Sequence, residues 1–428
     1  MNNFLNIFSK KNLIKSIKDF SSLFFSNVLQ KIFGLIREPV LAFFFGTSNL
    51  FANYLMIKTA SDFISQFTVG NSLRANLLPK FTKFYNDNQQ VSLKNLNSFV
   101  KKFNIYIFLF TQILQSLVIF YFDFENKLVF FLVSLFLSFG ICFNFYNTIF
   151  LTILQAKGNF LKYAKASVLN AFVSVCFLYP LTLFFSVIGI VISRFLGIIT
   201  LTFSYVFPMS KENRGANLNL SYSDFNIYLL ILNNVVPLTI ITIKFFSGTD
   251  GSNTITYFTY AVFILNAIFT AIITNLNTLI LKYNSIVKNN IRTYFSIVLV
   301  IFLGISFYSF VNFYGDYIIE IIFMRGAFKI SDVLITSSLL QKITIPFLLI
   351  FIASILFQTF FSQNLDKHKS KIKVMSILFI SFLTISYLLI SFLNEDHLTS
   401  VIYFTYIISI FLIIMSLYSF IISTNENK

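Results

Sequence analysis

The sequence predicts an all-α polytopic membrane protein, with about 12 transmembrane helices in two six-helix lobes around a central cavity. Three observations support this fold class. Of the 428 residues, 57% are hydrophobic and only 11% are charged, against roughly 25% charged residues in a soluble protein. The mean hydropathy is +0.79. Apolar runs of about 20 residues, the length that crosses a bilayer, recur along the whole chain.

The apolar runs give the expected helices in chain order. Several runs are longer than a bilayer requires, which indicates tilted helices or helices that project beyond the lipid. Residues 1–19 carry apolar residues near helical spacing with lysines between them, and are expected to form a cytoplasmic or interfacial segment. The expected spans are 20–45, 50–80, 103–122, 128–155, 161–183, 186–208, 226–246, 254–282, 293–313, 334–362, 373–394 and 399–422.

The basic residues are distributed unevenly between the two sides of the membrane. With the N-terminus inside, the inner segments hold 22 of the 32 Lys and Arg residues, whereas the outer loops hold four, Lys127, Lys244, Arg325 and Lys329. This asymmetry follows the positive-inside rule, so both termini are expected in the cytoplasm. The net charge of +16 therefore indicates topology, and no nucleic-acid partner is expected.

The longest polar interruption in the middle of the chain is residues 209–224, "MSKENRGANLNLSYSD". It is expected to be a cytoplasmic linker between an N-lobe of spans 1–6 (20–208) and a C-lobe of spans 7–12 (225–428). The lobes resemble each other weakly: "LLPKFTKFYN" matches "LILKYNSIVKN" at an offset of 202 residues, and the connections after spans 4 and 10 match at a similar offset. Two matches at nearly one offset predict a parallel repeat, an architecture typical of transporters.

Six basic residues fall inside the expected spans, where each ionisable group costs at least about 2.5 kcal/mol. Such residues almost always face a bundle interior or a wet cavity, so we expect them to line a shared basic cavity. Fixed positive charge there favours an anion, and arginine offers a two-pronged fork that matches phosphate. The basic residues are Lys31, Arg37, Lys58, Arg74, Arg194 and Lys342, and the clear acids beside them are Glu38 and Asp62.

These residues also have structural interpretations. Lys58 and Asp62 are four residues apart, so they lie on one helix face and can form a structural ion pair. Arg74 can extend toward the inner surface. Arg194 and Lys342 can lie closer to a helix end than the expected bounds.

The first span contains residues that favour a bend. Pro39 removes a helix hydrogen bond and frees a carbonyl near residue 35. Gly34 adds local flexibility. Glu38, next to Arg37, supplies the nearby carboxylate. We expect Gly34, Glu38 and Pro39 to support the cavity as a hinge.

No catalytic residue, metal site or cofactor is expected. A membrane glycosyltransferase or acyltransferase would need a carboxylate or histidine near a membrane surface, but His368 and His397 are interpreted as solvated loop residues. Cys142 and Cys176 fall inside spans, and they are expected to be buried apolar residues because no spacing indicates a metal site or disulfide framework.

The segment "KIFGLIREPVLAFFFGTSNLFANYLMIKTASDFISQFTVGNSLRANLLPKF" resembles the opening of the MurJ/MviN lipid II flippase family, within the MOP exporter superfamily. The similarity runs ungapped from Lys31 to Pro79, with Gly34, Arg37 and Gly46 also at the family's positions. It resumes in "TYFTYAVFILNAIFTAIITNLNTLILKY" and in the segment that begins "IIFMRGAFKISD", which resembles the family's FxxGxF…D pattern.

The resemblance implies a MOP flippase-like bundle that alternates between inward and outward openings. Its cargo would be an undecaprenyl-diphosphate-linked saccharide, lipid II-like or an exopolysaccharide or O-antigen intermediate, with its tail among the membrane lipids. It implies a monomeric transporter of the bacterial cytoplasmic (inner) membrane, with no enzyme activity and no cofactor.

The chain departs from the family at several positions that serve the diphosphate. Arg37 keeps its arginine and Lys31 keeps the charge of the other helix 1 position. The family's charged residues on helices 2 and 8 are replaced by Ser65-Gln66, Gly70-Asn71 and Val262-Phe263, with Asn266 at a nearby acidic position. Two alternatives therefore stay open: a multidrug-type exporter of the same superfamily, which would prefer acidic cavity residues, and a non-transporting scaffold relative.

Overall fold

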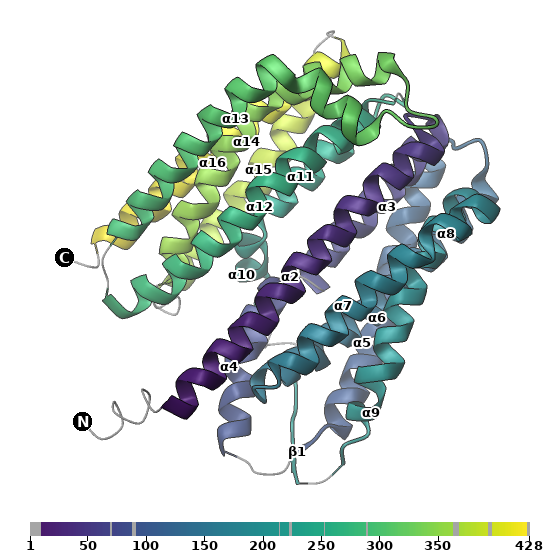
Figure 1. The fold of residues 1–428 in the computed structure, drawn as a ribbon. Coiled ribbons are helices and arrows are strands. Elements are labelled where there is room, and N and C mark those ends of the chain that lie inside the picture. Colours follow the sequence, from purple (N-terminus) through teal and green to yellow (C-terminus); the bar gives the residue numbers. More distant parts are fainter. Residues whose placement is uncertain are drawn as a thin grey trace. The chain divides into compact units, whose positions relative to one another are not determined.

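The computed structural model describes residues 10–68, 71–87, 91–213, 215–221, 225–251, 253–287, 290–362, 368–392 and 396–425. The described chain is dominated by long helices (Figure 1). By internal packing it forms two compact units. The first comprises Met1–Val40 and Ile64–Phe225, and the second comprises Leu41–Phe63 and Asn226–Lys428.

The first unit is organised around α6 (Lys127–Ala156). This helix packs against α4, α5 and α8, and α7 packs against α8. The other elements of this unit are α2 (Lys10–Phe45) up to Val40, the last turn of α3 (Asn49–Thr68), α4 (Asn71–Asp87), α5 (Lys94–Tyr121), α7 (Phe160–Cys176), α8 (Leu178–Leu201), the π-helix η1 (Thr202–Val206) and α9 (Phe207–Ser210).

Polar side chains join neighbouring helices inside this unit. The Ser138 hydroxyl donates to the side-chain oxygens of Gln112 and Gln115 on α5, both at 2.9 Å. On the other side of α6, Thr202 donates to the side chain of Asn147 at 3.0 Å. Because lipid tails are as apolar as leucine, such bonds and close packing hold membrane helices together where the hydrophobic effect does not.

Helix α6 ends at a glycine because the chain there needs a left-handed backbone. Gly158 has φ +72°, which costs glycine little. Its N–H donates to the Gln155 carbonyl and the Asn159 N–H donates to the Leu154 carbonyl, the two bonds that close a helix end. The chain thus turns from α6 into α7 within three residues.

Helix α8 contains a break that corresponds to the expected boundary between spans 5 and 6. Ser186 has φ 51° and ψ −130°, so the helix is kinked there. Further on, the Phe207 N–H donates to the Thr202 carbonyl, which makes η1 a π-turn. Pro208 follows at the start of α9. A proline ring clashes with the preceding turn of a regular helix, and a π-turn relieves such a clash.

Two short strands join the loop before α5 to the segment after α9. In β1 (Val91–Ser92) and β2 (Ala216–Asn217), Val91 pairs with Ala216 and Ser92 with Asn217 in parallel. Beyond β2, Leu218 and Leu220 are buried. Much of the expected linker 209–224 is therefore packed onto the first unit.

The second unit is organised around α14 (Ile330–Phe361), which packs against α12, α13 and α16. Thus α6 and α14 each contact the preceding helix, the helix before that, and the second helix after. This is the pattern that a repeat predicts. The other elements are the last turn of α2, most of α3, α10 (Ile227–Asn233), α11 (Val235–Phe246), α12 (Thr254–Val287), α13 (Ile291–Phe323), α15 (Lys369–Ser391) and α16 (His397–Asn425).

Seven helical segments among the described residues are long and apolar enough to cross a membrane, or eight if α10 and α11, which meet at 73°, form one broken span. A multi-pass membrane protein is therefore supported. Every expected span overlaps described helix. Several spans comprise parts of two helices: 50–80 contains α3 and α4, 161–183 contains α7 and the start of α8, and 226–246 contains α10 and α11. The expected total of twelve crossings stays a prediction.

Two expectations about burial were wrong. Cys176 is exposed rather than buried, because it ends α7 beside the exposed Phe177. His368 is only 2% exposed rather than solvated, because its ring packs 5.4 Å from the ring of Phe360.

Candidate functional site

Arg37 and Lys31 lie on different sides of α2. Six residues advance an α-helix by 600°, so the two side chains leave the axis about 120° apart. Arg37 is half-buried and shares a side of α2 with Ser26 and Phe33. This side packs against α7: the Ser26 hydroxyl donates to the Ala164 carbonyl at 3.2 Å, and the Phe33 ring lies 5.9 Å from the Phe172 ring. Lys31 is exposed. Arg37 thus points to the packed side of α2 and Lys31 away from it.

Glu38 shares a helix side with Lys31, because seven residues complete almost two turns. The two residues are about 10 Å apart along the helix axis. The helix continues through Pro39 to Phe45. The chain passes from the first unit to the second directly after Val40. Pro39, with the carbonyl it frees four residues earlier, therefore lies next to this crossing point.

The remaining predicted cations of the first unit lie on other helices. Arg194 is half-buried on α8, eight residues after the Ser186 kink, or about 12 Å along the axis. It therefore lies well inside the helical segment, as the sequence predicts. Arg74 lies on α4, and its side chain is outside the described residues. In the second unit, Lys342 is exposed on α14.

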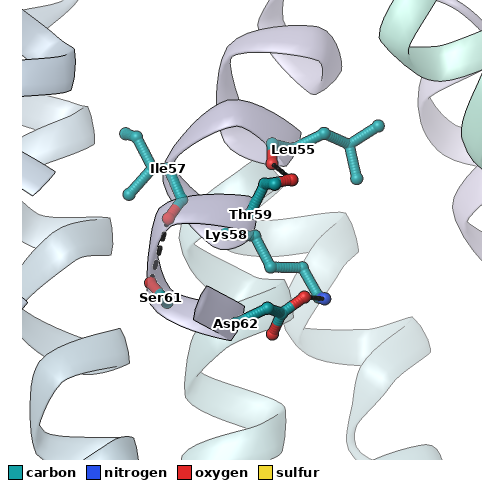
Figure 2. A network of polar contacts seen from close by, with 6 residues as sticks. All are labelled: Leu55, Ile57, Lys58, Thr59, Ser61 and Asp62. Carbon is teal, nitrogen blue, oxygen red and sulfur yellow. Dashed lines mark hydrogen bonds and ion pairs between the residues drawn. The ribbon is translucent and has the colours of Figure 1, made fainter. Parts of the chain in front are cut away.

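Lys58 and Asp62 on α3 form the ion pair that their spacing predicts. The Lys58 ammonium contacts the Asp62 carboxylate, and the side chains are 15% and 30% exposed. Figure 2 shows the two side chains meeting on one side of the helix. The nearby hydroxyls of Thr59 and Ser61 donate to backbone carbonyls one turn earlier, at 2.6 and 2.9 Å. The Lys58 charge is therefore largely neutralised by its neighbour.

This pairing gives a stability prediction. Lys58→Met removes one partner and leaves a partly buried carboxylate without it, so we expect the free energy of unfolding to fall by on the order of 1–3 kcal/mol. In the double variant Lys58→Met, Asp62→Asn no charge is left alone, and most of that loss is expected to be recovered. Thermal unfolding of the purified protein in detergent measures both. Equal losses in the single and double variants would contradict the pairing.

A cluster of hydrogen-bonded side chains in the second unit contains several of the residues that match the MurJ/MviN family, and it gives them a structural role. Asp332 is buried at the start of α14, where it accepts hydrogen bonds from the Lys329 N–H at 2.8 Å, the Thr47 hydroxyl at 2.9 Å and the Tyr257 hydroxyl at 3.2 Å. The Tyr260 hydroxyl donates to the Gly46 carbonyl at 3.1 Å. We call these six residues the turn cluster. They join the α2–α3 turn to the start of α14.

The described residues include no group of three or more His, Cys, Asp or Glu side chains placed to hold a metal ion. His397, the second histidine considered above, has its Nε2 3.5 Å from the Asp250 carboxylate and its ring 5.3 Å from that of Phe246. The absence of a catalytic site and of a cofactor stays a prediction.

No family model matches the chain, and no curated protein matches it in sequence. Solved structures do match. A lipid II flippase MurJ in an inward closed conformation matches with a TM-score of 0.72 and 18% identity, covering 96% of this chain and 90% of that chain. The chain has the MurJ fold.

The wider superfamily shares this fold at greater distance. An inward-facing multidrug resistance MATE family transporter of the MOP superfamily matches with a TM-score of 0.61 and 10% identity, over 94% of both chains. A MOP superfamily transporter from Pyrococcus furiosus matches with a TM-score of 0.53 and 13% identity, over 97% of this chain and 94% of that one. The MurJ fold therefore extends over nearly the whole chain, as the resemblance of its first helices implies.

Within this MurJ fold, the positions that depart from the family are uncharged. Val262 is buried, and the Phe263 ring packs 5.9 Å from that of Phe323, so this part of α12 belongs to the apolar core. Ser65 and Gln66 are half-buried on α3. Gly70 lies outside the described residues, as does the side chain of Asn71. Among the described residues, the mid-helix cations are Lys31 and Arg37 on α2, Arg194 on α8, the paired Lys58 on α3 and the exposed Lys342 on α14.

Proposed function

We propose that this chain is a membrane flippase that moves an undecaprenyl-diphosphate-linked saccharide from the inner to the outer leaflet by alternating access. The observation that carries the proposal is a MurJ fold whose apolar helices contain cations far from their ends. The saccharide is lipid II-like or an exopolysaccharide or O-antigen intermediate. The protein acts as a monomer in a bacterial inner membrane, with both termini in the cytoplasm.

The chemistry of the cargo fits these residues. A prenyl tail stays in lipid during transfer, whereas a diphosphate cannot cross about 30 Å of hydrocarbon unaided. Arg37 offers the two-pronged guanidinium that matches phosphate oxygens, and Arg194 offers a second one. Lys31 points to another side of α2 than Arg37, so its charge acts on the phosphates only at longer range. Lys58 contributes less, because Asp62 already neutralises it.

Transfer needs no chemical catalysis in this account. The cationic side chains replace the water around the phosphates, and movement of one unit against the other changes the side to which the phosphates have access. Where the cytoplasm is negative, export of two negative charges is downhill by roughly 4–5 kcal/mol per 100 mV if the whole field is crossed. The membrane potential can therefore drive the cycle.

The second candidate function is export of organic cations, favoured by the match to a multidrug resistance MATE family transporter. A site for cationic drugs needs unpaired acidic side chains. Of the two acids predicted in the spans, Asp62 is paired with Lys58 and Glu38 shares a helix side with Lys31. The excess of positive charge favours the anionic cargo. A non-transporting scaffold relative would show neither activity.

A depletion experiment separates these functions. When the protein is depleted in its own host, at least one class of polyprenyl-diphosphate saccharide is expected to accumulate in the inner leaflet, and re-expression should clear it. Sensitivity to cationic drugs should not change. If no such saccharide accumulates, the flippase proposal fails; a rise in drug sensitivity alone would support the multidrug function.

A further inference from the structure

The first unit contains a cavity of about 530 Å³ where α6 ends and α7 begins. This volume lies within the range of about 300–1,000 Å³ that is typical of ligand pockets. Its wall combines Lys157, Lys162 and Lys165 with Glu212 and with apolar side chains such as Met209. None of the diphosphate-binding residues proposed above lines it, so it is a separate site.

The charges around this cavity do not cancel. The Lys157 ammonium lies 2.7 Å from the Glu212 carboxylate and 5.1 Å from the centre of the Tyr85 ring. Burial, and then the charge of Glu212, raise the pKa of Tyr85, so its phenol stays neutral. Lys162 and Lys165 are exposed, and within the described part of the chain neither forms an ion pair. The three lysines and one carboxylate leave a net charge of about +2.

The start of α7 adds to this positive potential. Asn159, which lines the cavity, precedes the helix and makes no side-chain cap bond. The first N–H groups of a helix have no partner within it and carry the positive end of the helix dipole. Lys162 and Lys165 lie on the first two turns of the same helix. An anion at this point would meet both lysines and the helix terminus.

Exposed apolar side chains adjoin the lysines. Leu161 is 44% exposed, Phe203 60% and Phe207 41%. The Lys211 ammonium lies 4.4 Å from the centre of the Phe207 ring. In a membrane protein such exposed apolar side chains contact lipid, and the positive-inside distribution puts this end of the helices at the cytoplasmic surface. The cavity therefore lies where lipid headgroups are found.

We propose that this cavity binds the phosphate headgroup of an anionic phospholipid of the cytoplasmic leaflet. Basic pockets between transmembrane helices on that side are suited to anionic headgroups. The apolar neighbours favour a lipid over free phosphate, because they can contact the acyl chains. The site does not depend on the proposed transport activity.

The test uses full-length protein in nanodiscs of phosphatidylcholine with increasing phosphatidylglycerol, and native mass spectrometry to count the phosphatidylglycerol retained. Lys162→Gln, Lys165→Gln is expected to weaken retention about thirtyfold, because each lysine contributes about fivefold near a membrane surface. The matched control is Lys101→Gln, Lys102→Gln, which removes two exposed lysines of α5 and should change retention less than twofold.

Two further measurements make the test decisive. Glu212→Gln removes the carboxylate and frees Lys157, so retention should tighten several-fold even if the double-lysine variant fails to fold. Equal losses in the pocket and control variants would show general surface attraction and overturn the site. Displacement of phosphatidylglycerol by millimolar inorganic phosphate would show a free-anion site and overturn the lipid assignment.

Discussion

Arg37→Ala is expected to reduce export of the lipid-linked saccharide by at least about thirtyfold, with protein abundance unchanged. A hydrogen bond to a charged group contributes about 1.5–3 kcal/mol of binding free energy, and the variant removes a guanidinium that can form two such bonds to phosphate. Arg37→Lys keeps the charge and loses the fork, so it should retain an intermediate rate. Accumulation of the saccharide in the inner leaflet, normalised to protein in the membrane, measures the effect.

The matched control is Arg325→Ala. Arg325 is exposed outside the helices, and its side chain donates to the Ile321 carbonyl of the preceding turn, at 3.3 Å. Its removal should leave export unchanged. Normal export by Arg37→Ala would remove Arg37 from the site. Loss of the protein from the membrane, rather than of its activity, would give Arg37 a structural role in packing α2.

Gly46→Val is expected to destabilise the second unit by about 3–5 kcal/mol and to reduce the amount of folded protein sharply. Gly46 has φ +51°, and a Cβ built there would lie 2.4 Å from the Ala327 carbonyl oxygen. The backbone conformation alone costs about 1–2 kcal/mol for a non-glycine residue. The clash adds to this, because the α2–α3 turn must then move away from the start of α14.

Gly251→Val separates the two contributions. Gly251 also has a positive φ, +69°, but among the described residues no atom beyond its two chain neighbours lies within 4 Å of a Cβ built there. The Gly251→Val variant should therefore lose only the stability that the strained backbone conformation costs, about 1–2 kcal/mol. Thermal unfolding of both variants in detergent gives the comparison. If the two lose the same stability, close approach to Ala327 does not explain the glycine at position 46.

The fold was largely predictable because apolar runs long enough to cross a bilayer recur along the whole chain. Each apolar run overlaps described helix, and the basic residues between the runs predict the topology. The details that composition missed are local backbone events. The π-turn before Pro208 lies inside an apolar run, whereas the kink at Ser186 falls at the expected boundary between spans 5 and 6. The packing of Leu218 and Leu220 was missed because the segment around them is polar.

The candidate site was predictable as a set of residues but not as an arrangement. The pairing of Lys58 with Asp62 followed from a four-residue spacing. The six-residue spacing of Lys31 and Arg37 already implies different helix sides, and that signal was overlooked. The cavity beside Lys162 was not expected either, because its walls come from segments about 50 residues apart in sequence.

The turn cluster shows that residues shared with a family can have a structural role rather than a role in binding the substrate. Gly46 and the FxxGxF…D segment match the MurJ/MviN family, and here they form the contacts between the α2–α3 turn and the start of α14. Asp332 accepts three hydrogen bonds within this cluster. In this chain these residues therefore have a structural role, whereas Arg37 is the matching residue whose chemistry suits a diphosphate.

Transport by the purified protein tests the central claim most directly. The protein is reconstituted in vesicles that carry an undecaprenyl-diphosphate saccharide with a fluorescent sugar, and a membrane-impermeant quencher reports its movement between leaflets. We expect movement that rises with the membrane potential and is lost in Arg37→Ala, while a cationic dye is not carried. Movement no faster than in protein-free vesicles, or equal in wild type and Arg37→Ala, would contradict the account.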